Sequence, residues 1–161
     1  MKTFTDNAGR TWTVAINVDA IKRVRALLDV DLLEIVDGKL IERLIRDPVL
    51  LCDVVYVLCK PEADTKGVSD EQFGQAMAGD AIEHATKVVL EELVGFSPSP
   101  RDRATLQRVL KTTYEVMDKA RDVIEARLDS GELDRVIEHA LQTAGNSSGS
   151  APASSASIPD H

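Results

Sequence analysis

The chain has 161 residues, of which 43% are hydrophobic and 29% are charged, so its composition is that of a globular domain able to bury one core. Only 4% are aromatic, which favours an aliphatic, helical core. The formal net charge is -8. Because binding of phosphates requires a basic face, this acidic balance argues against a nucleic acid as the main ligand.

Neither membrane insertion nor export is predicted. The longest unbroken apolar run, Val54 to Cys59, is far too short to span a bilayer, and the first residues contain no apolar signal segment. Cys52 and Cys59 lie seven apart in a helical pattern, about 10 Å along the axis, and cannot pair with each other within that helix. We therefore expect reduced thiols and a cytoplasmic location.

A β-hairpin is predicted over about residues 1–16. Segments 2–5 and 10–16 are rich in Thr, Val and aromatic residues, and the intervening Asp6-Asn7-Ala8-Gly9 suits a turn. An isolated hairpin is marginal in water, so we expect Phe4, Trp12 and Val14 to pack on helices that follow.

Several amphipathic helices follow the hairpin. Asn17 is an expected N-cap, a short helix follows the Asp37-Gly38 turn, and Asp47-Pro48 opens a strongly apolar helix that ends at Lys60-Pro61. Because the helix that begins at Asp47-Pro48 is apolar on nearly all sides, we expect it at the centre of the core.

The segment from Glu62 to Gly67 reads as a polar loop. Beyond it, Ser69 and Gln72 form a predicted capping box, with Val68 and Phe73 as the hydrophobic staple. The next helix begins near Asp80 and ends near 96. One side of this helix carries an apolar stripe that we expect to be buried: Ile82, Ala85, Val89 and Leu93. The other side carries charged residues that we expect to face water: Glu83, Lys87, Glu91 and Glu92.

A helix of nearly thirty residues is predicted after Ser99, followed by a break at Ser130-Gly131 and a last short helix. We therefore expect one mainly α domain over residues 1–143, with the small hairpin packed on a multi-helix body. Residues 144–161 are rich in Ser, Ala, Gly and Pro and are expected to form a disordered tail.

No catalytic, cofactor or metal motif is recognisable in the sequence. His84, His139 and His161 lack partners at diagnostic spacings, and the chain has no HExxH, CxxC, GxSxG or phosphate-binding glycine loop. The Glu91-Glu92 pair is expected on a polar helix face, without the burial that acid-base catalysis requires. We therefore expect no enzymatic activity, no cofactor and no metal. One alternative function stays open, that of an enzyme acting on a small molecule in a pocket where several polar side chains converge.

The middle of the chain contains an ordered series of short sequence patterns. The shared pattern is Asp47-Pro48, then Leu51 to Pro61, then Gly67-Val68-Ser69 with Phe73, and then Gly79-Asp80-Ala81-Ile82 with Ala85. In this order it resembles tail assembly chaperones encoded among the tail genes of long-tailed bacteriophages and prophages. The similarity covers roughly residues 14–128, and the N-terminal hairpin is a departure from it.

The resemblance implies a non-enzymatic chaperone that binds the tape measure protein, keeps it soluble and assists assembly of the tail tube. Two alternatives stay open: a structural component of the virion, and another helical protein-interaction module. Self-association into a homo-oligomer also stays open. From the residues alone, the candidate protein-binding positions are apolar side chains of the last two helices: Tyr114, Met117, Leu133 and Ile137.

Overall fold

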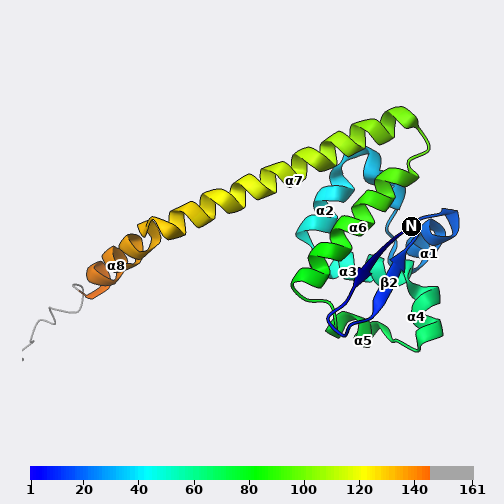
Figure 1. Cartoon of the computed structure of the whole chain (residues 1–161), viewed down its shortest axis with the longest axis horizontal. Coiled ribbons are helices and arrows are strands. Elements are labelled where there is room, and N and C mark those ends of the chain that lie inside the picture. The colour runs from blue at the N-terminus through cyan, green and yellow to red at the C-terminus, as the bar shows by residue number, and fades with distance from the viewer. Residues whose placement is uncertain (146–161) are drawn as a thin grey trace, which may run out of the picture. The chain divides into compact units, whose positions relative to one another are not determined.

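The computed structural model describes residues 1–145 and confirms a mainly helical fold with an N-terminal two-stranded hairpin packed on helices (Figure 1). Its elements are β1 (Lys2–Thr5), β2 (Thr11–Val14), α1 (Val18–Leu28), the 3-10 helix η1 (Leu32–Asp37), α2 (Lys39–Arg46), α3 (Pro48–Leu58), α4 (Lys60–Lys66), α5 (Asp70–Gln75), α6 (Asp80–Phe96), α7 (Pro100–Asp129) and α8 (Glu132–Gly145).

The chain divides into two compact units, Met1–Tyr114 and Glu115–His161, with the boundary inside α7. The expectation of one domain over residues 1–143 stays a prediction. α8 ends at Gly145, and the rest of the tail expected over 144–161 lies outside the described residues. None of the helices within residues 1–145 combines the length and the apolar content needed to cross a membrane.

The hairpin forms as predicted and turns one face to the helices. β1 and β2 are antiparallel, with Phe4 opposite Trp12. Because side chains alternate along a strand, Phe4, Trp12 and Val14 share the inner face, and all three are buried. β1 runs alongside α6 (Figure 1), and Lys2 pairs with Glu91 on that helix. The predicted packing of the hairpin on later helices is thereby confirmed.

α3 is the centre of unit 1, as its apolar composition predicts. It begins where expected, because the Asp47 carboxylate accepts from the backbone N–H groups of Val49 and Leu50, and Pro48 occupies the first turn. α1, α2, α4, α5 and α6 all contact it. Its buried side chains are Leu51, Val54, Val55, Val57 and Leu58.

The loop predicted over residues 62–67 is wrong, because most of this segment is α4. Pro61 lies in the first turn of that helix, where a missing N–H group costs nothing, so it starts a helix in addition to ending α3. Ala63 is buried, and Gly67 closes the helix at a φ of 65°. Ion pairs four residues apart support its exposed side: Lys60–Asp64 and Glu62–Lys66.

The capping box at α5 is confirmed in both directions. The Gln72 backbone N–H donates to Ser69 Oγ over 3.2 Å, and the Ser69 N–H donates to Gln72 Oε1 over 3.0 Å. Val68 and Phe73, the predicted staple, are both buried. Phe73 also meets the Trp12 ring edge-on, with the ring centroids 5.1 Å apart.

α6 and the first part of α7 complete the core of unit 1. Ala85, Val89 and Leu93 of α6 are buried as predicted, whereas Ile82 is only partly buried. α7 has the predicted length, with 30 residues, and the break after it falls at Ser130 and Gly131. Its two fully packed side chains, Leu106 and Leu110, both belong to unit 1.

Candidate protein-interaction surface

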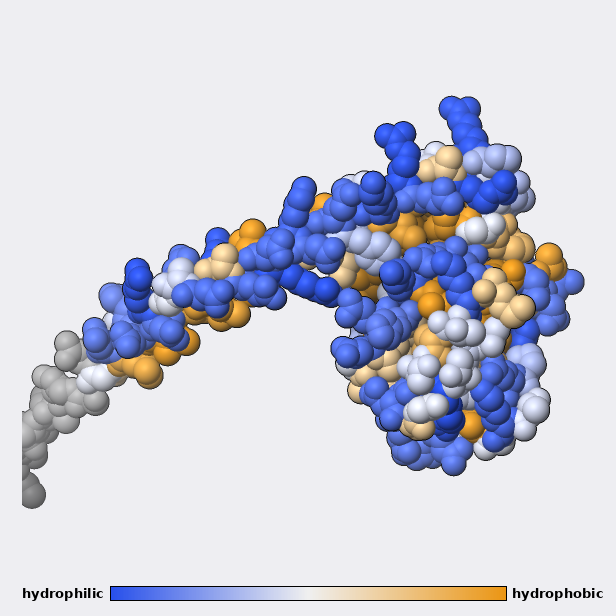
Figure 2. All heavy atoms as spheres, viewed as in Figure 1, coloured by the Kyte–Doolittle hydropathy of each residue, from blue (hydrophilic) through white to orange (hydrophobic). Residues whose placement is uncertain are grey.

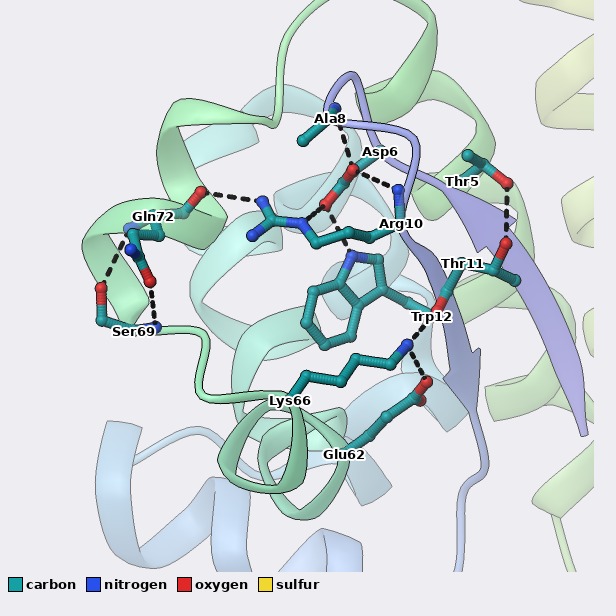
Figure 3. Close-up of polar contacts among 10 residues, drawn as sticks. All are labelled: Thr5, Asp6, Ala8, Arg10, Thr11, Trp12, Glu62, Lys66, Ser69 and Gln72. Carbon is teal, nitrogen blue, oxygen red and sulfur yellow. Dashed lines mark hydrogen bonds and ion pairs between the residues drawn. The ribbon is translucent and has the colours of Figure 1, made fainter.

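A cluster of polar contacts surrounds the buried carboxylate of Asp6, at the turn of the hairpin (Figure 3). Trp12 Nε1 and Arg10 Nε each donate to Asp6 Oδ2 over 2.8 Å. The backbone N–H groups of Ala8 and Arg10 donate to Asp6 Oδ1 over 2.9 Å. Four donors use the lone pairs of both oxygens, so the geometry gives this carboxylate an anchoring role and leaves it no acceptor capacity for a substrate.

Helix α4 covers the other side of the indole ring (Figure 3). Lys66 Nζ lies 4.7 Å from the centroid of the Trp12 ring and donates to the carbonyl oxygen of Thr11 and to Glu62 Oε1. Glu62 in turn accepts from the Thr13 N–H over 2.9 Å. These contacts join β2 to α4. They show how residues 62–67, predicted as a loop, are held in a helix.

The titration of Asp6 follows from the same contacts. Burial favours the neutral acid, but the hydrogen bonds from Trp12 and Arg10 outweigh it and hold the pKa of Asp6 below its ordinary 3.8. The charged form therefore stabilises the fold. A general acid or base would need a pKa shifted towards neutral pH, which is the opposite direction.

The cysteines are placed as structural thiols. Burial raises the pKa of Cys59 to about 12, and its Sγ donates to the carbonyl oxygen of Thr13. Burial and nearby Asp53 also raise the pKa of Cys52. A thiol that stays protonated is a poor nucleophile and a poor metal ligand. Within residues 1–145, no three His, Cys, Asp or Glu side chains gather in an arrangement that could hold a metal ion.

Unit 2 exposes a row of large apolar side chains, which we call the apolar face. Figure 2 shows them gathered along one side of the second half of α7 and of α8. None of the side chains of α8 is buried, and Leu141 is 67% exposed. The members of the apolar face are Val116, Val123, Ile124 and Leu128 of α7 and Leu133, Val136, Ile137 and Leu141 of α8.

Helical periodicity places these residues together. On α7, Val116 and Val123 are seven residues apart, beside Met117 and Ile124 with the same separation, so the four form one stripe. At the end of unit 2 where the helices join, an open hollow of about 270 Å³ lies between α7 and α8. Its lining combines apolar side chains with two charged ones: Ile124, Arg127, Glu132, Leu133 and Val136.

The structure separates the four binding residues predicted from the sequence. Leu133 and Ile137 belong to the apolar face and are 43% and 53% exposed. Met117 is partly buried beside it. Tyr114 is the last residue of unit 1 and packs partly buried against its core. Burial, with a smaller effect of Glu91, raises the pKa of Tyr114 to about 12.

Sequence reasoning missed most members of the apolar face. Val116, Val123 and Val136 each follow the helical repeat, and the seven-residue recurrence of valine on α7 was the available signal. Their exposure could not be seen in the pattern, because an amphipathic stripe has the same spacing whether or not another element covers it.

Comparison with protein-family models, with curated proteins and with solved structures finds no match.

Replacing Asp6 by Ala should lower the free energy of unfolding by about 3 kcal/mol, because the Trp12 and Arg10 donors lose their partner in a buried setting. Denaturant titration followed by circular dichroism measures it. The control is Asp122→Ala on an exposed part of α7, which should change stability by less than about 0.5 kcal/mol. Equal effects of the two substitutions would contradict the anchoring role.

The contribution of Asp6 to the free energy of unfolding should also depend on pH. A carboxyl group whose folded pKa lies below its unfolded value contributes stability above the unfolded value and loses it as pH falls through the folded one. The difference in unfolding free energy between the wild-type chain and Asp6→Asn should therefore be larger at about pH 6 than at about pH 3. A difference that stays constant over this range would exclude the charge as the stabilising element.

The apolar face should contribute little to the stability of a single chain. Leu133→Ala combined with Ile137→Ala should lower the unfolding free energy by less than about 1 kcal/mol, because both side chains are already exposed to water. Leu90→Ala in α6, where the side chain is 0% exposed, should cost about 3 kcal/mol. Denaturant titration at low protein concentration compares them. A loss at the face as large as that at Leu90 would mean that another part of the chain covers it.

Proposed function

We propose that this chain is a non-enzymatic binding protein whose apolar face takes up an apolar helical segment of another protein. The observation that carries the proposal is the exposure of large apolar side chains on two consecutive helices, which soluble proteins otherwise avoid. A partner helix with apolar residues three and four apart would match a surface with the same periodicity. The net charge of -8 supports solubility while that surface is open.

The resemblance of residues 14–128 to tail assembly chaperones supports a particular partner and location. In this proposal the chain binds the tape measure protein of a long-tailed phage in the host cytoplasm and keeps it soluble while the tail tube forms. The part that carries the resemblance is the helical body around α3, α5 and α6, and the apolar face adds a surface suited to a long apolar client. The function requires no cofactor.

The test is co-expression with the tape measure protein of a long-tailed phage that encodes this chain. The client should become soluble and co-purify with the tagged chain. Ile124→Asp with Ile137→Asp should reduce the co-purified client at least about tenfold, because two buried carboxylates would oppose burial of the client. The matched control is His139→Asp with Gln142→Asp, which adds two carboxylates to the far side of α8.

Three outcomes would contradict the proposal. The client could stay insoluble, or the control variant could lose it to the same extent as the face variant. Recovery of the chain from purified virions, measured by mass spectrometry, would instead favour a structural virion component, because an assembly chaperone leaves the particle.

A further inference from the structure

The charges that border the apolar face differ between its two helices. On α7, Lys119 lies three residues after Val116 and four before Val123, so it borders the stripe. Arg127 lies four residues after Val123 and reaches the hollow between the helices. The acidic side chains of this part of α7 fall on its opposite side: Glu115, Asp118, Asp122, Glu125 and Asp129.

α8 has the reverse arrangement. Asp134 and Glu138 lie three residues before Ile137 and Leu141 respectively, so both border its stripe. Glu132, four residues before Val136, borders the other side and lines the hollow. Arg135 and His139 fall on the far side of the helix. The apolar stripe of α7 therefore has one cation at its border and one at its end beside the hollow, whereas the stripe of α8 is edged by carboxylates.

Within the described chain, these border charges find no partners in their own molecule. Lys119, Arg127, Asp134 and Glu138 form no ion pair within 4.0 Å in residues 1–145, although Arg127 and Glu132 line the same hollow. In contrast, charged side chains next to the unit 1 core are paired, as Lys2 is with Glu91 and Lys66 with Glu62. The border charges are available to a second molecule.

We propose that the apolar face is covered by a second copy of this chain, with α7 of one copy packed on α8 of the other. A two-fold axis repeats every contact, so two complementary helices on one surface make that surface complementary to itself. Lys119 and Arg127 of each copy then face Asp134 and Glu138 of its partner, while the apolar stripes pack between them. Opposite charges at the rim fix which helix meets which, and burial of the stripes supplies affinity.

This pairing goes beyond the proposed client binding and does not rest on it. The second copy would cover the face while no client is present, and a client helix would have to displace it. The two proposals are therefore tested by different measurements: the oligomeric state of the purified chain alone, and recovery of the client in co-expression.

Sedimentation equilibrium of the full chain tests the pairing. The wild-type chain should sediment as a dimer at micromolar concentrations. Lys119→Glu with Arg127→Glu, and separately Asp134→Lys with Glu138→Lys, should each raise the dimer dissociation constant at least about tenfold by placing like charges opposite each other. The variant with all four substitutions should restore the dimer, because the opposite charges face each other again. Asp122→Lys with Asp129→Lys, on the far side of α7, is the control and should not change the dissociation constant.

Restoration by the four-fold variant is the decisive result, because general destabilisation cannot produce it. Circular dichroism of each variant checks that helix content is unchanged, as exposure of these side chains predicts. A monomeric wild-type chain at about 100 µM would overturn the proposal. So would a dimer that tolerates both charge reversals, or a four-fold variant that stays monomeric.

Discussion

The position of the N-terminal hairpin depends on one buried carboxylate. Two strands alone are marginal in water, and Trp12 can be buried only if its N–H group finds an acceptor. Asp6 supplies that acceptor and is itself stabilised by Arg10 and by backbone donors of the turn. With the indole fixed, Phe73 packs on its edge and Lys66 covers its face. The hairpin thus closes the core beside α6 and connects the start of the chain to helices more than fifty residues later.

The helix caps of this fold could be predicted from the sequence because each cap joins residues that are close along the chain. The caps at Asn17 and Asp47 and the box at Ser69 each require only a side chain and an N–H group within three residues. The error at α4 has a related cause, since a proline that ends one helix also suits the first turn of the next. Glu91 was expected to face water because the helix alone gives no sign that Lys2 lies opposite it.

The Asp6 cluster could not be predicted in this way. Its turn was recognised from Asn and Gly, but the bonds that matter connect Asp6 with Trp12 and connect the hairpin with α4 and α5. Such pairings depend on how distant segments meet. The same limit explains why Tyr114 and Ile137, both predicted as binding positions on amphipathic helices, end in different settings. Tyr114 packs partly buried against the core of unit 1, whereas Ile137 stays exposed in unit 2.

The two units therefore use charge differently. In unit 1, ion pairs and the Asp6 hydrogen bonds join elements that are already packed, so charge fixes the arrangement of a filled core. In unit 2, Lys119 and Asp134 edge apolar stripes that nothing in the described chain covers, so charge there can select only what comes from outside. Because the edges of α7 and α8 have opposite signs, a second copy satisfies both at once, while a client helix must match one sign or the other. Displacement of the copy by a client would then require a partner with greater apolar area, as a long apolar protein provides.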